Sequence, residues 1–203
     1  QALYENYDNL TEEEKKANLA DIARSSKRLT SLVDNLINLS KLSTSRHALN
    51  RTYFNLSDLI YTRVNICKKI YAEDREFNFN IPGDIFIYCD KYYIELVLDN
   101  LIVNAIQYCS KGSITIELSG DGDLGDAILF SIKDTGMGIA SEDLMYIFEP
   151  FAVSSKTKSK AGGRGIGLAL CKKVIEAHGG TIWAESKFGI TVFKFTLPNK
   201  ANS

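Results

Sequence analysis

Two asparagines stand one helical turn apart in a segment that otherwise has the pattern of a buried helix. Residues 90–108 carry apolar side chains at helical spacing behind Asp90, a suitable N-cap, yet Asn100 and Asn104 fall on another face. Asparagine is a poor helix former, so its presence here needs a reason. Each could cap a neighbouring loop, or the two amide oxygens could be directed at a hard cation such as Mg²⁺, which prefers oxygen ligands.

A carboxylate followed by glycines forms the second pattern. Asp134 directly follows a predicted strand and opens the run Asp134–Ile139, which contains Gly136 and Gly138. Glycine lets a ligand come close to the backbone, and an Asp at a strand end can accept a hydrogen bond from an exocyclic amine such as that of adenine. A plain turn is the alternative explanation for this pattern taken alone.

The third and fourth patterns suit an anion. Residues 152–165 carry four basic side chains and no acidic one, as expected either for a mobile lid over phosphates or for a solvated loop tip. The run Phe148–Phe151 before it would be the apolar hinge. The glycines of 163–167 then open a helix whose free N–H groups can bind an anion. The spacing is neither that of a P-loop nor that of the dinucleotide fingerprint.

The elements that must position these residues alternate between helix and strand. The sequence predicts helices over 11–45, 55–72, 90–108, 141–148 and 167–177, and strands over 77–81, 85–89, 114–118, 127–133, 181–186 and 191–197. The pair 77–81 and 85–89 would turn at Pro82-Gly83. We therefore expect an α+β fold with a mixed sheet covered on one face by helices.

The first long helix has the pattern of a helix packed along another helix. Thr11 and Glu14 form a capping-box signature, and Ile22, Leu29 and Leu36 repeat every seven residues. The alternative is that this helix lies on its own domain. The favoured interpretation is a coiled-coil or bundle helix followed by a polar hinge over 43–50.

Composition excludes several classes of protein. The 203 residues carry 24 Lys+Arg against 25 Asp+Glu, which argues against a general nucleic-acid binder, and no apolar run is long enough to span a bilayer. The four cysteines have no zinc spacing and are expected to be free thiols in a reducing compartment, the cytoplasm. Because the chain does not begin with Met, it is expected to be a piece of a longer protein.

The order and spacing of the four patterns resemble the catalytic, ATP-binding domain of sensor histidine kinases, in the GHKL superfamily that includes gyrase B, MutL and heat-shock chaperones. Leu98–Ala105 resembles the N box, Asp134–Ile139 the G1 box, Phe148–Phe151 the F box and Gly163–Leu170 the G2 box. The resemblance covers essentially the whole chain. It implies a two-layer α/β sandwich of the Bergerat type over residues 51–203, preceded by a partial dimerisation hairpin over 1–50.

The resemblance also implies a site for ATP and Mg²⁺. Asn104 would hold the metal with support from Asn100, Asp134 would bind the adenine amino group, and Tyr108 would pack against the base. Glycine-loop amides and lid cations would meet the phosphates, and Thr191 would lie near the adenine. The residues assigned to ATP binding are Asn100, Asn104, Gln107, Tyr108, Asp134, Gly136, Gly138, Ile139, Lys158, Lys160, Gly163, Arg164, Gly165, Ile166, Gly167, Leu168 and Thr191.

Two departures from the family pattern bear on activity. Gln107 stands where the family usually has a Lys or Arg, and no histidine followed by an acidic residue and a Pro is present. His47 lies in the hinge, and His178 lies at a helix end, where it is expected to satisfy the last carbonyls. We therefore expect a chain that binds Mg·ATP or Mg·ADP but lacks the phosphoacceptor, so that no catalytic residue is assigned to it.

The expected partners follow from the same resemblance. The complete protein would form a homodimer through its helical hairpin and pass the phosphoryl group to the receiver domain of a response regulator. The complete protein could be membrane-anchored, but this segment is expected to contact neither membrane nor nucleic acid. Two alternatives remain: a stand-alone ATPase, for which Glu95 is the candidate base, or a degenerate binding module. Glu95 is disfavoured because it lies nine residues, or about half a turn, away from Asn104 around the helix.

Overall fold

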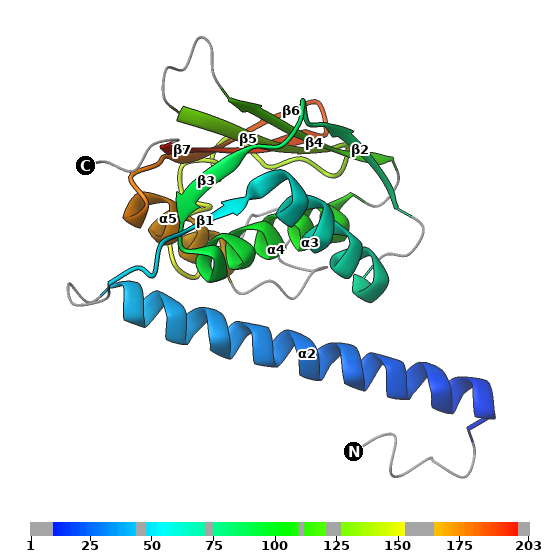
Figure 1. Ribbon diagram of the computed structural model, residues 1–203. Helices are drawn as coiled ribbons and strands as arrows, with labels where there is room; N and C mark the ends of the chain where they lie inside the picture. Colours follow the sequence, from blue (N-terminus) through cyan, green and yellow to red (C-terminus); the bar gives the residue numbers. More distant parts are fainter. Residues whose placement is uncertain are drawn as a thin grey trace.

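The computed structural model describes residues 10–43, 48–71, 75–109, 112–120, 127–152 and 165–198. Its helices are α2 (Glu12–Leu42), α3 (Leu56–Tyr71), α4 (Lys91–Tyr108) and α5 (Gly167–Ala177). Its strands are β1 (Thr52–Asn55), β2 (Glu76–Asn80), β3 (Phe86–Cys89), β4 (Ser113–Gly120), β5 (Ala127–Asp134), β6 (Ile182–Lys187) and β7 (Ile190–Pro198). Helices α3, α4 and α5 form a layer beneath one face of the main sheet (Figure 1).

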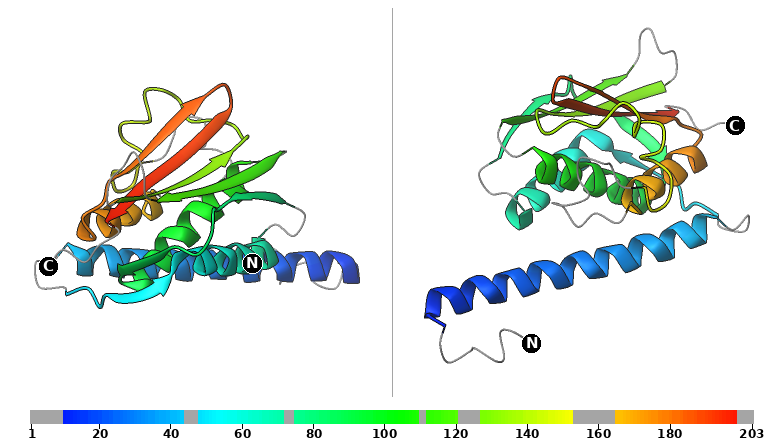
Figure 2. Two further views of the ribbon diagram at one scale, coloured as in Figure 1. Left: turned by 45° about the horizontal axis from the view of Figure 1, so that its top comes forward. Right: turned by 180° about the vertical axis from the view of Figure 1, so that it is seen from behind.

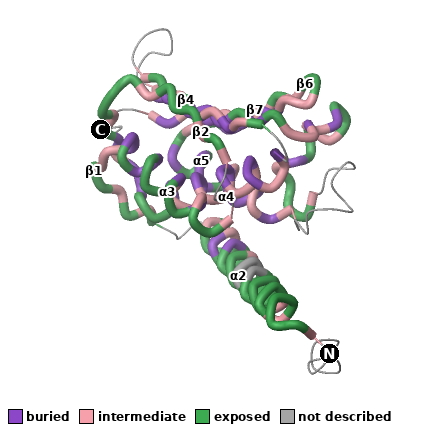
Figure 3. Tube along the Cα trace, turned by 90° about the vertical axis from the view of Figure 1, so that its right-hand side faces the viewer, coloured by how far each residue is buried: buried purple, intermediate pink, exposed green. Residues whose placement is uncertain are grey.

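The main sheet is mixed, as the sequence predicts. Its order is β2-β4-β5-β7-β6, in which β2 runs parallel to β4 and every other neighbouring pair is antiparallel. Side chains alternate along β5 and β7, so that Phe130 and Phe195 are fully buried and stack with their ring centroids 4.7 Å apart. The α+β expectation is confirmed, and the core lies between the sheet and the helical layer (Figure 3).

Helix α4 is the centre of the helical layer. Asp90 caps it by accepting a hydrogen bond from the Tyr93 N–H at 3.4 Å. Ile94, Leu98 and Leu101 are fully buried on its inner face. The predicted span is therefore confirmed, and the helix carries both asparagines of the first pattern.

Two strands that looked like a hairpin do not pair with each other. β2 lies at the edge of the main sheet beside β4, whereas β3 pairs with β1, a strand that the sequence pattern did not reveal. The reason lies at the start of α3, where the Ser57 hydroxyl donates to the Gly83 carbonyl at 2.6 Å and accepts from the Ile85 N–H at 3.2 Å. The segment around Pro82-Gly83 is thus fixed to a helix instead of closing a turn between strands.

The short helix predicted over 141–148 is wrong. The structure has consecutive turns there. Most of their hydrogen bonds join an N–H to the carbonyl three residues earlier, such as Tyr146 N–H to the Asp143 carbonyl at 2.9 Å. Met145 and Tyr146 are exposed, and only Ile147 of this stretch is buried. Because packing of an apolar face supplies most of a helix's stability, this segment lacks what would extend its turns into a helix.

Helix α2 runs along the outer side of the helical layer (Figure 2). The predicted capping box of Thr11 and Glu14 is present. The predicted apolar row stays about half exposed at Ile22, Leu29 and Leu36, while Leu39 packs partly against the core. The helix therefore lies on its own domain through another face, which leaves the row available to a different partner.

The structure also places the cysteines and His178. All four cysteines are buried and free, as expected. No helix among the described residues is both long and apolar enough to cross a membrane. His178 is buried at the end of α5, where its Nδ1 bonds the Val174 carbonyl at 2.8 Å and its Nε2 accepts the Asp90 N–H at 3.0 Å. The expectation that His178 satisfies a late carbonyl is confirmed.

The buried His178 makes stability depend on pH. Burial lowers its pKa below the usual value, so the unfolded chain binds a proton more readily, and the contribution of the neutral imidazole is lost as pH falls below about 6.5. Between pH 7 and pH 5 the wild type should therefore lose more unfolding free energy than His178→Gln does. Urea titrations at several pH values measure this difference, because the contributions of all groups that both proteins share cancel in it. Unfolding free energies that change with pH in parallel for the two proteins would contradict the prediction.

Candidate functional site

The carboxylate of Asp134 is buried at the end of β5 with one oxygen unpartnered. The residue is 3% exposed, and its Oδ1 makes no hydrogen bond to any residue that the structure describes. Burial raises the pKa of Asp134 to about 7, although a hydrogen bond from the Gly136 amide opposes the rise. A buried acceptor without a donor is unusual in a folded protein, which makes this oxygen a candidate contact for a ligand or a water molecule.

A row of polar side chains crosses three strands at this end of the sheet. Asp134 lies directly opposite Thr191, and Thr191 lies directly opposite Ser186 on the next strand. Thr191 is buried like Asp134, whereas Ser186 is partly buried. The predicted neighbours Asp134 and Thr191 are thus brought together.

The glycines after Asp134 permit a close approach to α4. A Cβ at Gly136 would lie 2.2 Å from the Tyr108 carbonyl oxygen and 2.6 Å from Asp134 Oδ1. Only glycine fits between the end of α4 and the carboxylate. Gly138 has φ +69°, a conformation that other residues rarely adopt. Asp134, Gly136 and Tyr108 therefore form one end of the candidate site.

The same loop is tied to the β6–β7 hairpin by a residue that the sequence analysis missed. The Ile139 N–H donates to Ser186 Oγ at 2.8 Å, and the Ser186 hydroxyl donates to the Ile190 carbonyl at 3.0 Å. A lone serine at the end of a strand has no distinguishing signal without the pairing register. Its role emerges only when β6 is aligned beside β7.

The other end of the candidate site joins α4 to the start of α5. A Cβ at Gly167 would lie 2.4 Å from Asn100 Oδ1, so the glycine accommodates that side chain. Asn100 donates from Nδ2 to the Leu96 carbonyl at 2.8 Å, and its Oδ1 accepts from Asn35 of α2 at 3.1 Å. Asn104 lies one turn further along α4 and is partly buried. The two asparagines thus differ in surroundings, because the amide of Asn100 is already engaged.

The ends of the predicted lid lie together. The Phe151 N–H donates to the Gly165 carbonyl at 2.9 Å, and both residues have positive φ. A Cβ at Gly165 would lie 2.2 Å from the Ala152 carbonyl oxygen, so glycine is required. The segment that they close holds Lys158, Lys160, Gly163 and Arg164, which lie outside the described residues.

The remaining predicted residues lie along the same two helices. Gln107 is partly buried in the last turn of α4, Ile166 is buried immediately before α5, and Leu168 packs partly against the core from its first turn. From Asn100 to Tyr108 the rise of α4 amounts to about 12 Å. Helix α4 therefore joins a buried acceptor at one end to the glycine-lined start of α5.

The polar groups of the candidate site fit a nucleotide better than a metal ion held by protein side chains alone. No group of three or more His, Cys, Asp or Glu side chains that could hold a metal ion occurs in the part of the chain that is described. The orphaned Asp134 oxygen matches an amino group of a ligand, and the position of a Cβ at Gly136 is bordered by the Tyr108 carbonyl and by this same carboxylate oxygen. A magnesium ion here would depend on amide and phosphate oxygens.

Comparison with protein families identifies the domain. Residues 89–201 match the family model described as histidine kinase-, DNA gyrase B- and HSP90-like ATPase. This match covers more than half of the chain and includes every element of the candidate site, from α4 to β7.

Individual relatives agree with the family match. The sensor histidine kinase WalK of Bacillus subtilis (strain 168) is 35% identical over 182 residues, which are 85% of this chain and 29% of WalK. The solved catalytic domain of the histidine kinase ThkA is 32% identical with a TM-score of 0.65, covering 74% of this chain and 97% of that one. ThkA in complex with the response regulator protein TrrA is 28% identical with a TM-score of 0.72, over 94% of this chain and 53% of that one. The present chain thus spans less than a third of WalK.

Substitution of Gly136 tests the contact between the glycine loop and α4. Gly136→Ala should lower the unfolding free energy by about 2–4 kcal/mol, because the new Cβ meets the rigid Tyr108 carbonyl. Gly120→Ala is the matched control, since its Cβ would meet only Ile128 and Ile85 side chains at 3.5 Å or more. Thermal and urea unfolding of the two variants measure the difference. Equal stability of both variants would show that the loop does not approach α4 this closely.

Proposed function

The chain belongs to the family of histidine kinase-, DNA gyrase B- and HSP90-like ATPases, and we propose that it binds ATP for transfer of the γ-phosphoryl group to a histidine. Asp134 receives the adenine amino group, Tyr108 and Ile139 border the base, and the start of α5 with Gly165 and Gly167 faces the phosphates. The same proposal gives the segment with Lys158, Lys160, Gly163 and Arg164 the role of a phosphate lid. Transfer of this kind depends on positioning and on neutralising charge.

The single observation that carries the proposal is the orphaned oxygen of Asp134. A buried carboxylate oxygen without a donor costs free energy, and an adenine amino group would offset that cost. Because the donor interacts best with the ionised carboxylate, nucleotide affinity should rise as pH increases through about 7, the pKa that burial gives to Asp134. The position of Thr191 directly across the ladder supports the same location for the base.

Asn104 is the proposed protein ligand of Mg²⁺, with phosphate oxygens and water completing the coordination. When bound, the ion would neutralise charge on the phosphates. Asn100 supports the site by packing against Gly167, and Gln107 supplies a hydrogen-bond donor without charge near the end of α4. The base of the lid is held closed by the bond between Phe151 and Gly165, which would keep lid cations near the helix start.

A stand-alone ATPase is disfavoured by the surroundings of Glu95. Such an enzyme needs a carboxylate that activates water near Asn104. Glu95 instead lies near Arg63 on α3, whose pKa is raised mainly by its hydrogen bond to Asp99 and to a smaller extent by the charge of Glu95. Arg63 also forms a bidentate ion pair with Asp99, so these carboxylates belong to the α3–α4 contact.

The proposed partners are a second copy of the protein and a response regulator. Residues 1–50 would contribute the second helix of a dimerisation hairpin and residues 51–203 the catalytic domain. The half-exposed row of Ile22, Leu29 and Leu36 supports a helix partner. ThkA, which resembles 94% of this chain, is known in complex with a response regulator protein, and this supports a receiver domain as the second partner.

Removal of the Asp134 carboxylate tests nucleotide binding. Asp134→Ala should weaken Mg·ADP binding by about 10- to 100-fold, the effect of losing a hydrogen bond to a charged acceptor. Asp58→Ala, which removes an exposed carboxylate in the first turn of α3, should bind as the wild type does. Isothermal titration calorimetry gives the dissociation constants. Equally weak binding by wild type and Asp134→Ala would favour a degenerate binding module.

The lack of an available acceptor histidine predicts nucleotide binding without autophosphorylation. Both ring nitrogens of His178 are engaged, and His47, which lies outside the described residues, has none of the sequence context of a phosphoacceptor. Incubation with γ-labelled ATP should leave the chain free of acid-labile phosphate at neutral pH. Appearance of such label, lost in His47→Ala, would contradict the prediction.

A further inference from the structure

We propose that Ser186 is a positioning residue for nucleotide binding, because its hydroxyl fixes the Gly138–Ile139 backbone against the β6–β7 hairpin. This inference rests on the proposed function and names a residue to which that function gives no role. The first support is a pair of hydrogen bonds through one oxygen atom. Ser186 Oγ accepts from the Ile139 N–H at 2.8 Å and donates to the Ile190 carbonyl at 3.0 Å, so its donor and its acceptor are both used.

The second support is that the two loops meet backbone to backbone. A Cβ at Gly138 would lie 3.2 Å from Ser186 Oγ and 3.4 Å from the Gly189 Cα, and a Cβ at Gly189 would lie 3.2 Å from the Gly136 carbonyl oxygen. Gly138 and Gly189 both have positive φ. Because the glycines at these contacts have no side chains, the two loops lie close together, and the Ser186 hydroxyl adds a directed hydrogen bond between them.

The third support is the pairing register. Ser186 lies opposite Thr191, and Thr191 lies opposite Asp134, so the serine belongs to the same cross-strand row as the buried carboxylate. The loop that Ser186 bonds begins at Asp134, and its Gly136 lies against the carboxylate of that same residue. A shift of the Gly138–Ile139 backbone would therefore change the geometry beside Asp134 without touching the start of α5.

The experiment compares a ligand that has a base with one that lacks it. Ser186→Ala should raise the dissociation constant for Mg·ADP about five- to tenfold, the effect of losing the hydrogen bond that holds the Ile139 N–H, and leave the constant for Mg·tripolyphosphate unchanged. Ser186→Thr keeps the hydroxyl and should restore ADP binding to within about twofold. Ser131→Ala is the matched control, because it removes a β5 hydroxyl that bonds Glu117 at 3.3 Å, away from the glycine loop.

Three results would overturn the inference: wild-type ADP affinity in Ser186→Ala, an equal loss of tripolyphosphate affinity, or a loss in Ser186→Thr as large as in Ser186→Ala. Ser186→Cys covers the case in which the alanine variant does not fold, because a thiol occupies similar space and is a weaker donor and acceptor. Its ADP affinity should fall below that of the wild type, and equality would overturn the inference. A wild-type chain that binds no ADP would instead overturn the proposed function on which the inference rests.

Discussion

The burial of one unpaired carboxylate oxygen is the constraint around which the site is built. Asp134 lies between β4 and β7 and beneath a glycine that touches the end of α4. Moving its pKa from 3.8 to about 7 corresponds to about 4 kcal/mol of free energy above neutral pH, which the nucleotide-free fold must bear. The fully packed core of β5 and β7 beside it, with the stacked Phe130 and Phe195, is rigid enough to hold the group in place.

Helix α4 sets the distance between the two ends of the candidate site. Its end touches the glycine loop at Tyr108, and its middle touches the start of α5 at Asn100. Both contacts are possible only because the facing residues, Gly136 and Gly167, have no side chain. The apolar face of α4 fixes the helix against the sheet, so the separation between the two ends is set by helix geometry and not by a loop.

Residues whose role is local could be predicted from the sequence, and residues whose role depends on strand register could not. The capping box at Thr11, the cap at Asp90 and the bounds of α4 and α5 follow from short-range patterns. The sequence did not predict β1 and paired β2 wrongly, because Ser57 bonds the segment around Gly83 to α3. No hydrophobic periodicity in the sequence indicates this contact. Likewise, Asp134 and Gly136 stood out by residue type, whereas Ser186 gained meaning only when β6, β7 and β5 were aligned.

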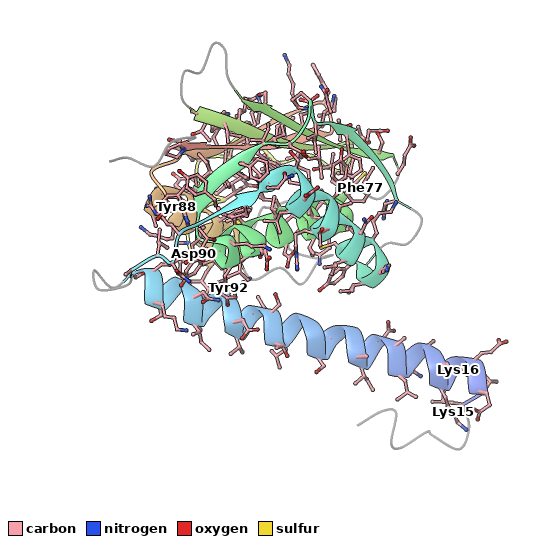
Figure 4. All side chains as sticks on the ribbon, viewed as in Figure 1. Lys15, Lys16, Phe77, Tyr88, Asp90 and Tyr92 are labelled. Carbon is pink, nitrogen blue, oxygen red and sulfur yellow. The ribbon has the colours of Figure 1, made fainter. Side chains whose placement is uncertain are left out.

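The contact between α2 and the domain uses amides where an apolar stripe would be expected. Asn35 and Asn38 are each 4% exposed, and Asn38 donates to the Tyr92 hydroxyl at 3.1 Å; Figure 4 shows Tyr92 reaching toward α2. Hydrocarbon surfaces can slide past each other with little change in free energy, but an amide bonds its partner at one alignment only. Water can replace those amide bonds when the surfaces part. These amide bonds therefore specify one alignment of α2 on the domain, and their loss to water on separation would cost little net free energy.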